Sequence, residues 1–165
     1  MAFVIIIPAR YQSTRLPGKP LRILAGKPLL QHVHECAQRT AASNIIIATD
    51  DERIASVART FANEVCMTAT SHSSGTQRLA EVIDQYQIAA DTIVVNLQGD
   101  EPLMPAVCIT QVAALLEQHT DANVATLSAP LRDAHELSNP NIVKVVTNTL
   151  GYALYFSRAM IPYQR

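Results

Sequence analysis

The sequence predicts an α/β protein with a mainly parallel sheet and helices on both faces. Short apolar runs rich in β-branched residues recur along the chain, as is typical of buried parallel strands. Between these runs, apolar residues repeat at i, i+3, i+4 and i+7, which is the pattern of amphipathic helices. Strands that alternate with such helices indicate parallel βαβ units, here in a single domain over residues 1–165.

The first half of the chain contains three predicted strand–helix pairs. The predicted strands are Phe3–Ile7, Ile45–Ala48 and Glu64–Met67. The predicted helices are Leu29–Arg39, Asp51–Phe61 and Thr76–Tyr86. Pro28 suits the first turn of its helix, where no backbone N–H is needed. We expect Asp50 to cap the helix that follows it.

The second half begins with a fourth strand, predicted over Thr92–Leu97, and a helix that starts at Pro105. The apolar positions of that helix are Ile109, Val112, Ala113 and Leu116. A fifth strand is predicted over Asn123–Ala129 and a short helix over Asp133–Leu137. Two final strands, joined by a turn around Gly151, are predicted over Ile142–Thr147 and Tyr152–Phe156.

The composition narrows the class of protein. With 165 residues, 48% of them hydrophobic and 16% charged, the chain is long enough and apolar enough to build a globular core. A formal net charge of −1 argues against a general nucleic-acid-binding protein. No apolar run is long enough to span a membrane, and no segment resembles a signal peptide. Cys36, Cys66 and Cys108 lack metal-ligand spacing, and we interpret them as free cytoplasmic thiols.

The loop after the first strand carries three spaced cations, Arg10, Arg15 and Lys19. Loops that leave the carboxyl ends of strands in open α/β sheets are the usual ligand sites, and such cations suit a polyphosphate. The alternative is a set of solvated surface charges. The loop is not a Walker A motif because Lys19 is followed by Pro20, and the chain contains no G-x-G-x-x-G.

The segment Gln98–Pro102, QGDEP, also follows a predicted strand, so we expect it to face the first loop. Asp100 could bind Mg²⁺, which usually takes one or two carboxylates together with substrate phosphates. Gln98 can donate and accept, which suits a nucleotide or sugar hydroxyl. The alternative is a turn with a helix cap.

A third segment, Thr70–Arg78, places several hydroxyls and Gly75 in front of a predicted helix. The free N–H groups of a helix N-terminus favour an anion or the carbonyl of a base. The alternative is an ordinary capping loop with Ser74 or Thr76 as the cap. We interpret His72 as a surface or loop histidine.

Five segments together resemble one enzyme family. In chain order they are IPARYQSTRLPGKPL, SHSSGTQRLAEV, VVNLQGDEPL, NPNIVKVV and GYALYFSRAMIPY. They closely resemble the 3-deoxy-manno-octulosonate (KDO) cytidylyltransferases from residue 3 to the last residue. The resemblance implies a nucleotide-diphospho-sugar transferase fold of Rossmann-like type, Mg²⁺ dependence and a cytoplasmic homodimer. It also implies the reaction of CTP with KDO to give CMP-KDO and diphosphate, for bacterial lipopolysaccharide biosynthesis.

The resemblance also implies roles for individual residues. Arg10, Lys19 and Asp100 would be the catalytic residues, the first two holding the triphosphate and Asp100 binding magnesium. The residues expected near the nucleotide are Pro8, Ala9, Arg10, Arg15, Lys19, Ser74, Gly75, Thr76, Arg78, Gln98 and Asp100. The residues expected to contact KDO are Arg15, Gln98 and Arg158.

The chain departs from the family pattern in one respect, because family members continue well past IPY. We therefore expect residues 1–165 to be the N-terminal portion of the enzyme, without a complete sugar pocket. Two alternatives stay open: a cytidylyltransferase for a related sugar acid such as an 8-amino KDO analogue, and a fragment that binds CTP without turnover.

Overall fold

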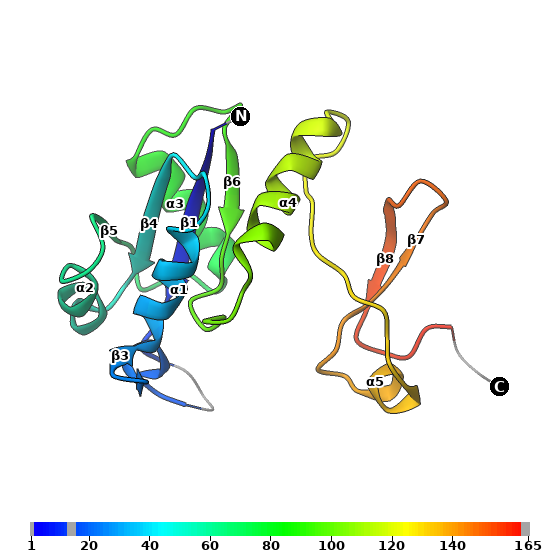
Figure 1. The fold of residues 1–165 in the computed structure, drawn as a ribbon, viewed down its shortest axis with the longest axis horizontal. Helices are drawn as coiled ribbons and strands as arrows, with labels where there is room; N and C mark the ends of the chain where they lie inside the picture. Colours follow the sequence, from blue (N-terminus) through cyan, green and yellow to red (C-terminus); the bar gives the residue numbers. More distant parts are fainter. Residues whose placement is uncertain (1, 13–15, 163–165) are drawn as a thin grey trace. The chain divides into compact units, whose positions relative to one another are not determined.

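The structure, a computed structural model, describes residues 2–12 and 16–162 (Figure 1). The chain divides into two compact units, residues 1–125 and 126–165. The sequence predicted one domain, and that grouping stays a prediction. Among the described residues, no helix is both long enough and apolar enough to cross a membrane.

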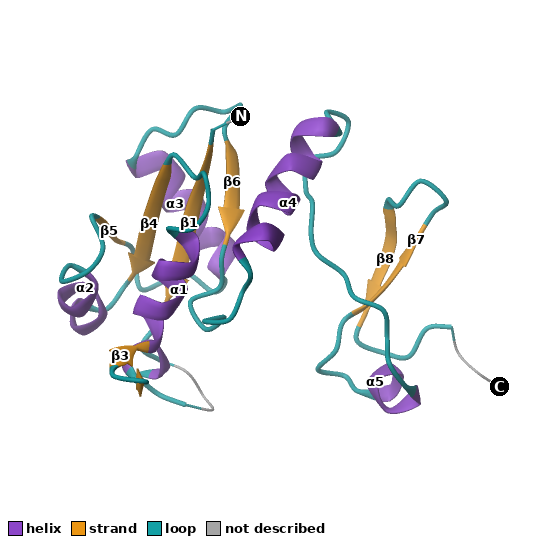
Figure 2. Ribbon diagram, in the orientation of Figure 1, coloured by secondary structure: helices purple, strands orange, loops and turns teal. Residues whose placement is uncertain are grey.

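A four-stranded parallel sheet forms the centre of the first unit (Figure 2). Its strands are β1 (Phe3–Ala9), β4 (Asn44–Thr49), β5 (Glu64–Met67) and β6 (Ile93–Asn96), in the order β5-β4-β1-β6. β1 pairs with β4 on one side and with β6 on the other. The predicted mainly parallel sheet is confirmed, and β1 is buried over Phe3–Ile7 because it has a neighbour on both sides and helices on both faces.

Alternate residues of β1 point to opposite faces of the sheet, and each set has its own helices. Ile5 and Ile7 lie in a cluster with apolar residues of α1 (Leu29–Ala37), α2 (Glu52–Ala58) and α4 (Ala106–Gln118). Val4 and Ile6 lie in a second cluster with Leu79 and Val82 of α3 (Gly75–Gln85). The predicted coverage of both faces is confirmed, with α3 on one face and the other three helices on the opposite face.

Three short elements between β1 and α1 were not predicted. They are a 3₁₀ turn, η1 (Lys19–Leu21), and the two-residue strands β2 (Ile23–Leu24) and β3 (Lys27–Pro28), which pair antiparallel. Ala25 and Gly26, which join them, have φ of 48° and 84°. Positive φ at both central residues is typical of the tight turns that connect hairpin strands.

The second unit consists of a short helix and a hairpin. The helix, α5 (Ala134–Ser138), is capped by Asp133, whose carboxylate accepts from the backbone N of Glu136 at 2.9 Å. The strands β7 (Lys144–Thr147) and β8 (Ala153–Ser157) pair antiparallel, as predicted. The buried Lys144 ammonium donates to three backbone carbonyls, those of Asn139, Ile142 and Arg158, at 2.6–2.9 Å.

Two predictions about local structure were wrong. Residues 123–129, all of them described, form no strand. Among the described residues no strand pairs with this segment, and Val124 is 82% exposed. The cap of α2 is Asp51 and not Asp50, because the Asp51 carboxylate accepts from the backbone N of Arg53 at 3.0 Å.

The order of the strands places a topological switch between β1 and β6. The chain leaves β1 towards β4 and β5, then returns to the opposite side of β1 to form β6. In open α/β sheets, the crevice at the carboxyl ends of two such strands is where ligands bind. The loops after β1 and β6 are therefore the first place to look for a site.

Gly99 allows those two loops to approach closely. A Cβ atom at Gly99 would lie 2.7 Å from the backbone O of Pro8, which is closer than any side chain tolerates. The backbone N of Leu97 also donates to the O of Ile6 at 3.1 Å, which holds the start of the β6 loop against β1. Only glycine fits at position 99 without a shift of the backbone.

We predict that Gly99→Ala lowers the free energy of unfolding by about 1–3 kcal/mol, because the added methyl group must displace the backbone at Pro8. Urea unfolding followed by circular dichroism measures this. Gly75→Ala is the matched control, since its Cβ would lie an ordinary 3.8 Å from the Pro8 ring. Equal stability of the two variants would contradict the steric explanation.

Candidate nucleotide-binding site

Three loops that the sequence singled out meet around Pro8, at the carboxyl end of β1. The loop after β6 touches Pro8 through Gly99, and the first turn of α3 lies against the Pro8 ring at Gly75. Arg10, two residues further on, reaches the loop in front of α3. The end of β1 thus joins all three segments, whereas the topology rule predicted this only for the first loop and the loop after β6.

Lys19 and Asp100 connect the first loop to the loop after β6. The Lys19 ammonium lies 2.7 Å from Oδ2 of Asp100, and the two side chains are 35% and 52% exposed. Gly18, in a left-handed conformation with φ 68°, precedes Lys19, and its backbone N donates to the O of Tyr11 at 2.8 Å. An ion pair this exposed contributes little to stability, so both charges are available to a ligand.

A hydrogen bond ties the Arg10 side chain to the loop in front of α3. Its Nη2 donates to the backbone O of His72 at 2.6 Å, and the side chain is half-buried. Among the described residues, the backbone O of His72 is the one acceptor that the structure shows for the guanidinium, which carries five N–H groups in all. A planar fork with remaining N–H groups suits a phosphate.

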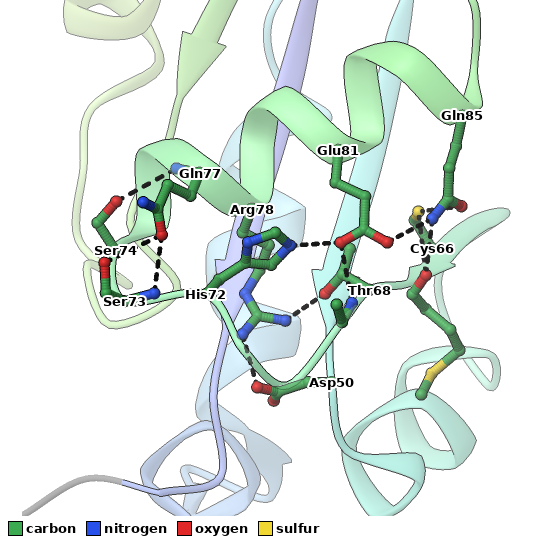
Figure 3. A network of polar contacts seen from close by, with 12 residues as sticks. Asp50, Cys66, Thr68, His72, Ser73, Ser74, Gln77, Arg78, Glu81 and Gln85 are labelled. Atoms are coloured by element: carbon green, nitrogen blue, oxygen red, sulfur yellow. Dashed lines mark hydrogen bonds and ion pairs between the residues drawn. The ribbon is translucent and has the colours of Figure 1, made fainter.

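The N-terminus of α3 is capped by its own side chains (Figure 3). The Ser74 hydroxyl accepts from the backbone N of Gln77 at 3.2 Å, and the Gln77 side-chain oxygen accepts from the backbone N of Ser73 at 2.8 Å. This is close to a capping box, in which a helix and the loop before it fix each other. Ser74 is the cap that the sequence allowed, and Thr76 is exposed in the first turn.

Arg78 is buried in a pair with Asp50. Its side chain is fully buried, and Nη2 lies 2.6 Å from Oδ2 of Asp50, which is 18% exposed. Nη1 donates to the hydroxyl of Thr68, whereas Nε has no hydrogen-bond partner among the described residues. Asp50 follows β4 and Thr68 follows β5, so Arg78 ties α3 to the ends of both strands. The sequence predicted Arg78 beside the nucleotide, and the structure places its guanidinium among protein groups.

The loop after β6 also carries Gln98 and Glu101. The exposed Gln98 amide donates to Oδ1 of Asn96 at 3.0 Å. Loss of hydration, and then the neighbouring charge of Asp100, raise the pKa of the Glu101 carboxyl. The described residues contain no cluster of three or more metal-ligating side chains, so Asp100 and its neighbour Glu101 are the acids that this loop offers to a cation.

The structure does not place two of the predicted residues relative to this site. Arg15 lies outside the described residues. Arg158 belongs to the second unit, where its Nη1 donates to the backbone O of Pro140 at 3.0 Å. The other residues expected near the nucleotide lie at the end of β1, in the segments that follow β1 and β6, or at the start of α3; they are Ala9, Arg10, Lys19, Ser74, Gly75, Thr76, Gln98 and Asp100.

Sequence reasoning missed several supporting side chains. The Arg53 guanidinium lies over the Tyr11 ring, 3.3 Å from its centre, and Glu81 is hydrogen bonded to His72. These partners are far apart in sequence and follow no motif. A parallel α/β sheet with cations, helix N–H groups and a carboxylate at its switch point is the arrangement typical of nucleotide-binding α/β proteins.

Comparison with known proteins supplies the family. The sequence matches the cytidylyltransferase family over residues 4–165, and the chain belongs to that family. It is 55% identical to the 3-deoxy-manno-octulosonate cytidylyltransferase of Histophilus somni strain 129Pt and 60% identical to that of Aeromonas hydrophila subsp. hydrophila. Both matches cover the whole chain, which spans 64% and 66% of these two relatives.

A solved structure shows the same similarity. It is the CMP:2-keto-3-deoxy-manno-octonic acid synthetase in complex with CTP, 42% identical, with a TM-score of 0.82 over all of this chain and 67% of that one. The predicted fold type and the resemblance to KDO cytidylyltransferases are thereby confirmed.

We predict that Arg78→Ala lowers the free energy of unfolding by about 3 kcal/mol, because it leaves the Asp50 carboxylate without its partner in a largely buried position. Arg59→Ala removes the exposed pair with Glu52 and should cost less than about 1 kcal/mol. Chemical denaturation of both variants measures the difference. Comparable losses in the free energy of unfolding would show that the buried Arg78–Asp50 pair contributes no more stability than an exposed pair.

Proposed function

We propose that this protein contributes the nucleotide-binding part of a KDO cytidylyltransferase, which converts CTP and KDO to CMP-KDO and diphosphate. The observation that carries the proposal is the contact between Lys19 and Asp100 across the switch point. There, a cation that can bind phosphate lies beside a carboxylate that can bind a metal, at the carboxyl ends of the strands. The chain itself belongs to the cytidylyltransferase family. The names of the relatives supply the substrates.

The triphosphate would bind between the first loop and the start of α3. Arg10 would offer its remaining N–H groups, and Lys19 would move its ammonium from Asp100 to a phosphate oxygen. The first turn of α3 adds free backbone N–H groups, and Ser74, Gly75 and Thr76 would lie beside the cytidine. Gln98, exposed after β6, would lie between nucleotide and sugar.

The chemistry is a nucleotidyl transfer. The anomeric 2-hydroxyl of KDO would attack the α-phosphorus of CTP in line and lose its proton to solvent, and diphosphate would leave with the electrons of the broken P–O bond. Arg10 and Lys19 would neutralise the charge that grows on the diphosphate. Such a step asks the protein mainly to position two substrates and to stabilise charge, which fits a site made of cations and backbone N–H groups.

Asp100 fits the role of magnesium ligand, since it is half-exposed and already faces a cation. Mg²⁺ usually keeps several waters and binds one or two carboxylates plus substrate phosphates, so one aspartate with CTP is a sufficient protein contribution. When bound, the ion would supply charge neutralisation and would make a coordinated hydroxyl more acidic.

We also propose that the enzyme is a homodimer in the cytoplasm. In the second unit, β8 exposes Leu154, Tyr155 and Phe156, each more than half exposed, and Leu150 beside it is 77% exposed. Apolar groups exposed to this extent favour a partner surface. Sedimentation velocity tests the dimer, and a monomer at micromolar concentration would contradict it.

We predict that Asp100→Asn in the complete enzyme, of which this chain is the N-terminal part, lowers turnover on the order of 100-fold at saturating CTP, KDO and Mg²⁺, because the amide binds the cation poorly. Diphosphate release measures this. Asp91→Asn, on an exposed loop before β6, is the control and should leave turnover unchanged. Normal turnover in Asp100→Asn would overturn the metal role. Absence of CTP- and KDO-dependent release from the unmodified enzyme would overturn the function itself.

A further inference from the structure

Glu81 holds the loop in front of α3 from the middle of that helix (Figure 3). Its Oε2 accepts from the backbone N of Ala69 at 2.9 Å and is hydrogen bonded to Nε2 of His72. Its Oε1 accepts from the Gln85 amide at 2.9 Å. The hydrogen bond from His72, followed by that from Ala69, lowers the pKa of Glu81, so the carboxylate stays ionised at neutral pH.

The same loop carries the acceptor for Arg10. The His72 ring faces Glu81, while the backbone O of the same residue accepts from Nη2 of Arg10 at 2.6 Å. The His72 side chain is 18% exposed and that of Glu81 is 26% exposed. A short path therefore runs from a carboxylate on α3, through one loop residue, to the guanidinium beside the end of β1.

We propose that Glu81 and His72 are positioning residues that hold Arg10 ready for the triphosphate; this rests on the proposed function. An arginine side chain loses much rotamer freedom when it is immobilised by a ligand. When the backbone carbonyl of His72 is fixed, it orients the Arg10 guanidinium before CTP binds. Part of the rotamer entropy is then already lost in the free protein, so binding costs less free energy. Neither residue needs to touch the nucleotide for this effect.

A second reading of the same contacts is that Glu81 only tethers a surface loop. The two readings differ in whether the effect of Glu81 on CTP binding passes through Arg10. A double-mutant cycle separates them, because two residues that act through one contact give effects that do not add.

The test measures the dissociation constant of CTP with Mg²⁺ by calorimetry. Glu81→Ala should raise it on the order of tenfold, as expected for a coupled network. Glu81→Gln should restore most of the affinity, since its amide oxygen can still accept from Ala69 and His72. Asp84→Ala, which removes an exposed acid from the same helix, should leave the constant unchanged.

The decisive comparison uses Arg10→Ala. In that background, Glu81→Ala should have no further effect on the dissociation constant. The same tenfold loss in both backgrounds would overturn the inference, and so would an unchanged constant in Glu81→Ala alone.

A readout without nucleotide keeps this inference separate from the proposed function. In the unliganded protein, the ¹⁵N relaxation of the Arg10 Nε–H group should show a more mobile side chain in Glu81→Ala than in Asp84→Ala. Equal mobility in the two variants would overturn the inference. If the unmodified protein binds no CTP, the proposed function fails, while this comparison still decides whether Glu81 orders Arg10.

Discussion

The burial of β1 on both faces is the constraint on which the rest of the structure depends. Phe3–Ile7 present apolar side chains alternately to two clusters, so helices must cover both sides of the sheet. Burial of one such side chain stabilises the fold by about 1.5–3 kcal/mol, which makes this strand costly to displace. With β1 fixed at the centre, its carboxyl end becomes a rigid point against which the loops of β6 and α3 are placed.

The charges around that point divide into two kinds. Arg78 and Asp50 are buried or nearly so and satisfy each other, so their role is to join α3 to the strand ends. Lys19 and Asp100 are exposed, so their separation costs little free energy. Arg10 is intermediate between these cases, since one N–H donates to the backbone O of His72 and the others make no hydrogen bond to the described residues. The buried pair keeps the strand ends and α3 in place, while the exposed charges can exchange their partners. This combination suits a nucleotide that must bind and then dissociate.

Periodicity and apolar runs predicted the sheet, because its two central strands, β1 and β4, are short apolar segments that are largely buried. The three site loops were predictable for a related reason: strand ends meet at one edge of a parallel sheet, whatever the side chains do. The direction of the Arg78 side chain was not predictable, since only the folded position of Asp50 determines it. The contact between Glu81 and His72 was not predicted, because the two residues are nine positions apart and follow no motif. The strand predicted over Asn123–Ala129 was wrong, because a strand requires a partner strand that local sequence cannot reveal.

The most direct test of the central claim is a crystal structure of this protein with CTP and Mg²⁺. The account predicts that the triphosphate lies at the carboxyl ends of β1 and β6, in contact with Arg10 and Lys19. Lys19 should have moved away from Asp100, and the Asp50–Arg78 pair should be unchanged. A triphosphate bound elsewhere, or bound while Lys19 still pairs with Asp100, would contradict the account.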